Sequence, residues 1–258
     1  MDAGDVRLTR EGRIAKIIFD RPAARNAMTW KMYEQLAVIC RELRDDPTIR
    51  VAVFRGAGGK AFVAGTDIAQ FLSFESGEDG IAYEARMEGY LEAVETLPMP
   101  TLAVIEGWAI GGGLAIATAC DLRIATSGSR LGVPIARTLG NCLSMTNTAR
   151  IVAALGPSNA KRILLLADLI SAEEALACGF LVGVVEPSDL DQRVENICQR
   201  LLGNAPMTLR VSKEAVRRLL HAGLPNGDDL VRLCYGSADF RIGVRAFVDK
   251  RDPAWTGE

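Results

Sequence analysis

The sequence is poor in the residues that build metal and disulfide sites. It contains a single histidine, His221, and its six cysteines are scattered without a Cys-x-x-Cys pair. One histidine excludes a histidine metal cluster, and unpaired cysteine spacing is typical of reduced thiols in a core. We therefore expect no metal site, and we expect His221, at the end of an expected helix, to lie on the surface.

An excess of charge of one sign and long apolar runs are also absent. The formal net charge of -2 gives no general attraction to nucleic acid or anionic membranes, and no apolar run reaches membrane-spanning length. Met1–Asp5 lacks the basic and apolar regions of a signal peptide, so a cytoplasmic location is expected. The 258 residues, 49% hydrophobic and 24% charged, predict a soluble globular chain with a sizeable core.

Glycine, by contrast, is concentrated between an expected strand and an expected helix. The buried strand Leu102–Ile105 leads into Gly111, Gly112 and Gly113, and an apolar helix follows over Leu114–Cys120. Glycines at such a junction let backbone N–H groups approach a ligand, because no Cβ intervenes, and the helix N-terminus adds partial positive charge. The pattern predicts that an anion, or an oxygen becoming one, binds there.

A second glycine-bearing loop, Gly56–Ile68, follows the expected strand Val51–Phe54. The central glycines do not have the spacing of a dinucleotide fingerprint. The second loop is not a P-loop, since Lys60 precedes Ala61 rather than Ser or Thr. The central glycines could also serve only the close packing of a helix. The presence of two such loops favours the other interpretation, in which backbone donors from both converge on one substrate oxygen.

Several spaced motifs together resemble the enoyl-CoA hydratase/isomerase (crotonase) superfamily. In chain order, these motifs are Asp20–Ala27, Phe62–Ile68, Glu106–Gly113, Cys120–Ala125 and Ala246–Arg251. The resemblance therefore covers essentially the whole chain. It implies an acyl-CoA ligand, with coenzyme A as part of the substrate and no separate cofactor.

The resemblance also implies that the thioester carbonyl accepts hydrogen bonds from the backbone amides of Thr66 and Gly112. When a thioester is attacked or loses a neighbouring proton, negative charge moves onto its oxygen. Fixed donors stabilise that charge, and removing one typically costs about 3 kcal/mol or more. Because the donors are backbone amides, a threonine side chain at position 66 is compatible with this role.

The fold that the resemblance implies is α/β, or α+β in some schemes, with repeated ββα units wound into a spiral. Strands and helices are expected to alternate up to the strand Leu181–Val185, and only helices after Asp189. We therefore divide the chain into a core, 1–188, that holds the CoA and acyl site, and a helical appendage, 189–258. The resemblance implies that this appendage builds homotrimers, often paired into hexamers.

Local signals predict several elements directly. Val6–Leu8 and Ile14–Phe19 are expected to pair as a hairpin, and Thr29 offers an N-cap to an amphipathic helix. Ser171 to Glu174 fits a capping box. A charged helix expected over Ala82–Thr96 has the composition of a solvated surface helix.

Further substrate contacts are implied by the resemblance alone. The backbone at Ala24, Arg25 and Ala64 would lie along the adenine and pantetheine, and Arg25 could add a charge for a phosphate. Lys250 would reach CoA phosphates, commonly those of a neighbouring subunit, although it is equally compatible with a solvated charge. The remaining implied positions around the ligand are Gly65, Asp67, Ile68, Gly111, Pro134, Ile135 and Leu139.

The sequence departs from the hydratases of this family at both catalytic glutamates. The two positions are occupied by Ala115 and Ile135. Neither side chain can hold or deliver a proton, so general acid–base work would need another residue. The usual two-glutamate hydration is therefore not expected, and isomerases of the family, which keep the second glutamate, differ from this chain too.

Other polar residues are candidates for the missing chemistry. Arg137 and Asn141 belong to the segment that borders the acyl pocket in relatives: Arg137 could bind an acidic acyl group, and Asn141 could orient a water. Both are also compatible with purely structural roles. Glu75 and Glu84, in the covering segment, are candidates for a base.

We expect an enoyl-CoA hydratase/isomerase-type enzyme that stabilises a thioester enolate and acts on an acyl-CoA by hydration or isomerisation. Decarboxylation or hydrolysis of a CoA thioester is the alternative. A non-catalytic homologue that binds acyl-CoA or RNA is a further one, although the near-neutral charge argues against RNA.

Overall fold

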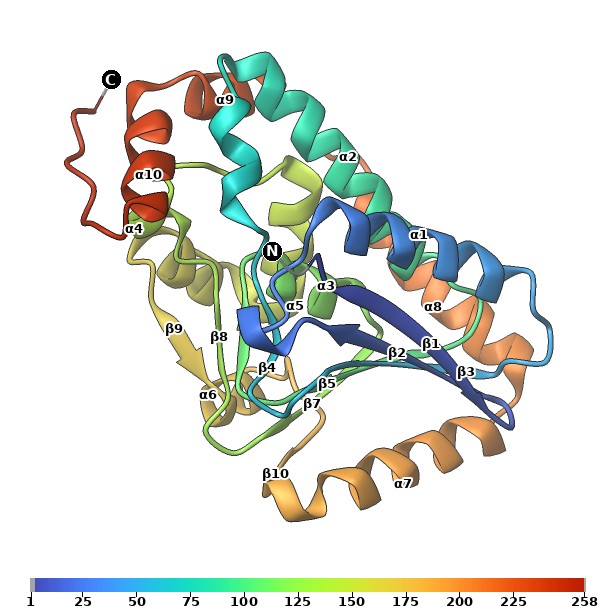
Figure 1. Ribbon diagram of the computed structural model, residues 1–258. Coiled ribbons are helices and arrows are strands. Elements are labelled where there is room, and N and C mark those ends of the chain that lie inside the picture. Colours follow the sequence, from blue (N-terminus) through green and yellow to red (C-terminus); the bar gives the residue numbers. More distant parts are fainter. Residues whose placement is uncertain (1–2, 258) are drawn as a thin grey trace.

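The structure is a computed structural model that describes residues 3–257, and it contains two β-sheets (Figure 1). The larger sheet has the strand order β1-β2-β3-β5-β7-β10. Its strands are β1 (Asp5–Glu11), β2 (Ile14–Asp20), β3 (Val51–Gly56), β5 (Thr101–Ile105), β7 (Leu122–Thr126) and β10 (Val184–Val185). Only β1 is antiparallel to its neighbour, which confirms the predicted hairpin.

The smaller sheet has the order β4-β6-β8-β9. Its strands are β4 (Ala61–Ala64), β6 (Trp108–Ile110), β8 (Arg130–Gly132) and β9 (Leu169–Ser171). The first three are parallel, and β9 is antiparallel to β8. Each successive pair, β3-β4, β5-β6 and β7-β8, contributes one strand to each sheet, so the chain winds as the spiral of ββα units expected from the sequence.

Helices follow or cover these strand pairs. They are α1 (Trp30–Arg44), α2 (Gly77–Glu95), α3 (Gly112–Ala119), α4 (Ile135–Thr138), α5 (Met145–Leu165), α6 (Ala172–Ala177), α7 (Leu190–Gly203), α8 (Pro206–His221), α9 (Asp228–Tyr235) and α10 (Ala238–Val248). Three short 3-10 turns are η1 (Pro22–Ala24), η2 (Ile68–Ser73) and η3 (Pro187–Asp189).

The larger sheet is covered on both faces (Figure 1). Because side chains alternate along a strand, Ala52 and Phe54 of β3 enter the main core beneath α1, whereas Val51 and Val53 face Leu190 and Ile197 of the α7 region. Burial on both faces explains why this strand is apolar without alternation.

Both predicted helix caps are present. Thr29 Oγ1 accepts from the Met32 N–H at 3.3 Å, and α1 buries its apolar face in the core. At α6, the Ser171 hydroxyl and the Glu174 carboxylate accept from each other's backbone N–H, as a capping box does.

Some boundaries differ from expectation. Helix α5 contains a kink that was not predicted from the sequence: Gly156 adopts φ 78° and ψ 155° before Pro157, and a second helical stretch follows. Helix α2 begins at Gly77 rather than Ala82, since Ser76 and Asp79 form another capping box. The strands β4, β6 and β9 have only three or four residues each, too few for a clear pattern in the sequence.

The last four helices pack on the rest of the chain rather than on one another alone. Helix α7 contacts β3 and β7, α8 contacts α5, α9 contacts α2, and α10 contacts η2. The division at residue 188 stays a prediction. Within residues 3–257, no helix is long and apolar enough to cross a membrane.

Candidate active site

A cavity of about 150 Å³ lies at the carboxyl ends of β4, β6 and β8. These parallel strands are in register, with Ala64 opposite Ile110 and Ile110 opposite Gly132. The segments that follow them therefore lie side by side, and all three contribute to the cavity wall. This is the edge of a parallel sheet at which ligands commonly bind.

The two glycine-bearing loops meet at this cavity. Gly112 is the first residue of α3, and Thr66 lies in an extended segment whose neighbours bond to Met28: the Met28 N–H donates to Gly65 O and the Asp67 N–H donates to Met28 O. Among the described residues, neither the Thr66 N–H nor the Gly112 N–H donates to a protein acceptor. Two backbone donors that the protein does not use thus border one cavity.

Gly112 and Gly113 have different structural roles. A Cβ on Gly113 would lie 1.9 Å from the carbonyl oxygen of Val63, so glycine allows α3 to pack closely on β4. A Cβ on Gly112 would lie 2.5 Å from Tyr33 Oη and 3.1 Å from Thr66 Oγ1, beside the cavity. Both interpretations of the sequence therefore apply, close packing at Gly113 and access to the backbone at Gly112.

The structure brings most of the predicted ligand residues together. Those that line the cavity are Ala64, Gly65, Thr66, Ile68, Gly111, Gly112, Pro134, Ile135, Leu139 and Asn141. Ala115 lines it too, so both positions that lack the usual glutamate face the cavity.

Other predicted residues lie next to the cavity wall. The Ala64 N–H donates to the Arg25 carbonyl at 3.0 Å, which aligns η1 and the residues after it with the first donor loop. Asp67 caps its own loop, because its Oδ1 accepts from the Ala69 N–H at 3.3 Å. Lys250 follows α10, and its N–H donates to the carbonyl of Phe247, whose side chain lines the cavity.

Arg137 is not brought to the cavity. It lies on the single helical turn α4, where Ile135, Thr138 and Leu139 face the cavity and Arg137 is exposed on the opposite side. Successive helical residues are about 100° apart, which separates it from these neighbours. The hypothesis that Arg137 binds an acidic acyl group in this cavity receives no support.

Glu84 is the one carboxylate among the described residues that line the cavity. The expectation that the charges of its helix are solvated is wrong at this position, because Glu84 is only 5% exposed. A signal was present: Glu84 lies three residues before Met87 and seven before Leu91, on the apolar stripe of α2. Glu75, the other candidate, is exposed and does not line the cavity.

Two donors hold the Glu84 carboxylate. Tyr235 Oη donates to Oε1 at 2.7 Å, and the Ser144 N–H donates to Oε2 at 2.8 Å. Burial raises the pKa of Glu84 to about 7, and the Tyr235 and Ser144 hydrogen bonds limit the rise. Near neutral pH this carboxyl group can therefore both accept and release a proton.

Two amide oxygens in the same wall have no protein partner. Asn141 donates from Nδ2 to Tyr235 Oη at 3.1 Å, but its Oδ1 is buried and unpaired among the described residues, and so is Oδ1 of Asn147. Buried carbonyl oxygens without a donor are costly. Their position suits a water or a ligand group that donates hydrogen bonds.

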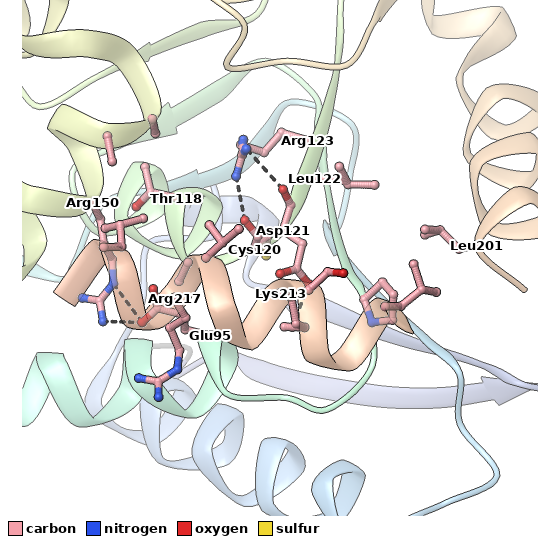
Figure 2. A pocket seen from close by; sticks show the side chains of 18 residues that line it. Glu95, Thr118, Cys120, Asp121, Leu122, Arg123, Arg150, Leu201, Lys213 and Arg217 are labelled. Carbon is pink, nitrogen blue, oxygen red and sulfur yellow. Dashed lines mark hydrogen bonds and ion pairs between the residues drawn. The ribbon is translucent and has the colours of Figure 1, made fainter. Parts of the chain in front are cut away.

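A larger cavity, of about 450 Å³, lies beneath α8 (Figure 2). Its charged residues pair with protein groups: Lys213 Nζ lies 2.7 Å from Asp121 Oδ2, and Arg123 donates to the carbonyl of Cys120 at 2.6 Å. We assign the site to the smaller cavity, because there two backbone N–H groups and two amide oxygens have no protein partner among the described residues.

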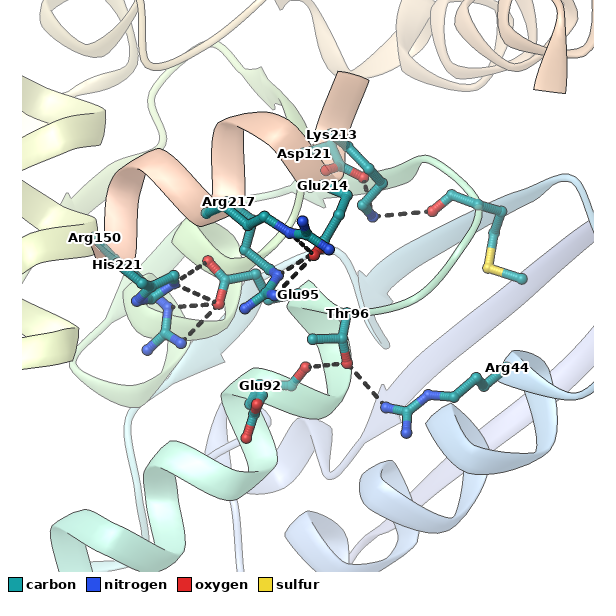
Figure 3. Close-up of polar contacts among 12 residues, drawn as sticks. Arg44, Glu92, Glu95, Thr96, Asp121, Arg150, Lys213, Glu214, Arg217 and His221 are labelled. Carbon is teal, nitrogen blue, oxygen red and sulfur yellow. Dashed lines mark hydrogen bonds and ion pairs between the residues drawn. The ribbon is translucent and has the colours of Figure 1, made fainter. Parts of the chain in front are cut away.

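His221 is not the surface residue expected from the sequence. Its Nε2 lies 3.0 Å from both carboxylate oxygens of Glu95, which also binds Arg150 (Figure 3). The Arg150 side chain is 2% exposed and bonds to Glu88 as well. Burial tends to raise the pKa of Glu95, but Arg150 and His221 together hold it below its usual value.

Comparison with known proteins agrees with this architecture. The family model described as enoyl-CoA hydratase/isomerase matches residues 9–258. The chain is 31% identical over 255 residues to the short-chain-enoyl-CoA hydratase of Clostridium acetobutylicum, covering 97% of each chain. It is 32% identical over 248 residues to the crotonyl-CoA hydratase of Syntrophomonas wolfei, covering 95% of each.

A solved structure of methylmalonyl-CoA decarboxylase, in complex with 2-nitronate-propionyl-CoA, superposes with a TM-score of 0.89 at 27% identity and covers 98% of both chains. Sequence and fold agree over nearly the full length of the chain. The protein belongs to the enoyl-CoA hydratase/isomerase (crotonase) family of acyl-CoA enzymes.

Proposed function

We propose that the protein converts an acyl-CoA through a thioester enolate, and that hydration or isomerisation of an enoyl-CoA is its reaction. The observation that carries the proposal is the pair of unused backbone donors, Thr66 N–H and Gly112 N–H, in one cavity. The names of its relatives in Clostridium acetobutylicum and Syntrophomonas wolfei support the hydratase assignment.

In this proposal the thioester oxygen occupies the space between the two loops. Both donors are held by secondary structure, Thr66 beside β4 and Gly112 at the start of α3, so they need no rearrangement as charge develops. The partial positive charge of the helix N-terminus acts in the same direction. The apolar wall, which includes Phe71, Met87 and Leu143, excludes bulk water and strengthens these interactions.

The coenzyme A moiety is proposed to extend along Ala24, Arg25 and Ala64 toward the surface. The hydrogen bond between Ala64 and Arg25 supports this path, because it joins the two segments. Arg25 and Lys250 are the proposed partners of the phosphates. Lys250 lies three residues after Phe247, whose side chain is in the cavity wall, which supports a contact with the subunit's own ligand. A contact with the ligand of a neighbouring subunit is the alternative.

Decarboxylation of a malonyl-type thioester is the second candidate. It is favoured by the similarity to methylmalonyl-CoA decarboxylase and by the loss of both usual glutamates at Ala115 and Ile135. Loss of carbon dioxide generates the enolate without a base, so this reaction depends most on the two backbone donors.

A homotrimer or hexamer is also part of the proposal. The outer face of α8 exposes large apolar side chains, with Met207 at 65%, Val211 at 59% and Leu219 at 78% exposure. Apolar faces of this kind are commonly covered by another subunit. Sedimentation equilibrium of the protein, compared with its Leu219→Glu variant, would measure the association directly.

The proposed function is tested with crotonyl-CoA, methylmalonyl-CoA and an aryl-CoA, each followed by mass spectrometry, alongside calorimetric binding of each thioester. Addition of water to crotonyl-CoA supports hydration, and release of carbon dioxide from methylmalonyl-CoA supports the second candidate. Absence of binding to all three would refute an acyl-CoA enzyme. Binding of all three without turnover would favour the non-catalytic homologue.

A further inference from the structure

The cavity contains one ionisable carboxyl group, that of Glu84, among the described residues, at a position that the family motifs do not indicate. Glu84, Tyr83 and Met87 of α2 line it on the side contributed by this helix, whereas Thr66 and Gly112 come from the two donor loops. A carboxylate and two backbone donors therefore share one enclosed space. That is the minimum needed to move a proton beside a carbonyl.

We infer that the Glu84 carboxylate is the proton-transfer group of this enzyme, in place of the two glutamates absent at Ala115 and Ile135, and that Tyr235 positions it. The inference rests on the proposed function, because it requires a thioester in the cavity. It goes beyond that function in naming the residue that touches the reacting carbon.

The geometry fits this role in three ways. Glu84 is fixed at both oxygens, by Tyr235 Oη at 2.7 Å and by the Ser144 N–H at 2.8 Å, so its orientation is set before a ligand binds. No cation pairs with it among the described ion pairs, unlike Glu88 and Glu95 on the same helix, which both bind Arg150. Each of its oxygens keeps a further lone pair for a proton.

Several ionisable groups face Glu84, of which Glu88, Cys142 and Cys234 do not line the cavity. These groups are Tyr235 of α9, Tyr33 of α1, Tyr83 and Glu88 of α2, Cys142 before α5, and Cys234 of α9. Burial raises the pKa of Tyr33, Tyr83 and Tyr235, which keeps all three neutral. The pKa of Glu84, by contrast, is near 7.

The Oδ1 atoms of Asn141 and Asn147, which are buried and have no partner among the described residues, also support this role of Glu84. Asn141 contacts Tyr235, and the Asn147 N–H donates to Ser144 Oγ, so both belong to the group of residues that holds Glu84. Two buried acceptors suit a water that donates both hydrogens. In a hydration, this water would lie beside the base.

The proton transfer can be written without a further reactant. A Glu84 oxygen forms an O–H bond with the proton of the acyl α-carbon as that C–H bond breaks. The electron pair becomes a carbon–carbon π bond, and the carbonyl π pair moves onto the thioester oxygen, where Thr66 and Gly112 donate. The reverse step returns the proton to the α-carbon or, in an isomerase, to the γ-carbon.

The test uses butyryl-CoA in D₂O, because deuterium exchange at its α-carbon requires only this step and not the natural acyl group. Wild-type protein, Glu84→Gln and the matched control Glu92→Gln are compared by mass spectrometry, with butyryl-CoA affinity measured for each. Glu92 lies on the same helix but is exposed and outside the cavity.

We expect exchange in the wild type and in Glu92→Gln, and at least about a 100-fold loss in Glu84→Gln with affinity changed less than about threefold. Glu84→Asp, which keeps a carboxylate, should recover part of the rate. Exchange in Glu84→Gln at the wild-type rate, or butyryl-CoA binding without exchange in the wild type, would overturn the inference and leave acyl-CoA binding intact. No binding by the wild type would overturn the proposed function, and the inference with it.

Discussion

The hydroxyl of Tyr235 donates a hydrogen bond of 2.7 Å to the carboxylate of Glu84, joining residues that are 151 positions apart in the sequence. This contact connects α9, in the C-terminal part of the chain, with α2 and the cavity. It means that the helices after residue 188 contribute to the orientation and the ionisation of a residue in the proposed active site.

Replacing Tyr235 by Phe should shift the pH dependence of α-proton exchange upward. The hydrogen bond from Tyr235 stabilises the ionised carboxylate, so the loss of this bond raises the pKa of Glu84 above about 7. The rate, which depends on the base form, should then rise at a pH higher by about one unit. Tyr90→Phe is the control, since that hydroxyl bonds to Arg86 instead. An unmoved profile in Tyr235→Phe would contradict this role.

Glu84→Gln should make the folded protein more stable at alkaline pH. The folded-state pKa of Glu84, about 7, is raised from an ordinary value of 4.5, so its contribution to stability is fully present below pH 4.5 and is lost as pH rises through 7. The loss is on the order of 3 kcal/mol. Glutamine does not titrate, so the variant does not lose this stability as the pH rises.

Urea denaturation of both proteins at pH 5 and pH 8 measures this effect. The variant should exceed the wild type in free energy of unfolding at pH 8, with a much smaller difference at pH 5. An equal difference at the two pH values would show that Glu84 does not titrate in this window.

Gly112→Ala should lower kcat by about 100-fold or more. The new Cβ would lie 2.5 Å from Tyr33 Oη and 3.1 Å from Thr66 Oγ1, so either the buried Tyr33, which bonds to Thr66, or the start of α3 must shift beside the proposed oxyanion position. Loss of one such donor costs about 100-fold or more in kcat. Gly89→Ala, inside α2 with no atom within 4 Å of the added Cβ, should keep full activity and gain up to about 1 kcal/mol in stability. Equal activities of the two variants would exclude the proposed donor.

Arg150→Leu should be strongly destabilising. Arg150 is buried and bonds to both Glu88 and Glu95, so its removal leaves Glu88 without its cation and Glu95 with His221 alone, at a cost of about 3–5 kcal/mol. Arg218→Leu breaks an exposed pair with Glu214, which solvent screens, and should cost far less. Free energies of unfolding in urea compare the two, and similar values would mean that the cluster in Figure 3 contributes little.

Much of the architecture was predictable because its signals are local. The Thr29 cap, the Ser171 capping box and the four C-terminal helices follow from neighbouring residues and from apolar periodicity. Short strands such as β4 and β9 were not predictable, because three or four residues carry too little pattern and depend on a partner strand. His221 was misplaced because its partner, Glu95, is 126 residues away.

The sequence by itself determined the two glycine-bearing loops and the motifs that carry the family resemblance, since these depend on spacing along the chain, and the resemblance in turn implied the spiral of strands and helices. Tertiary structure alone decided which side chains share the cavity. Burial made Glu84, one charge among many on its helix, a carboxyl group with a pKa near 7, and Arg137 lies exposed outside the cavity. The reason is physical: ionisation depends on solvent access and on donors such as Tyr235, which only the folded chain brings into place.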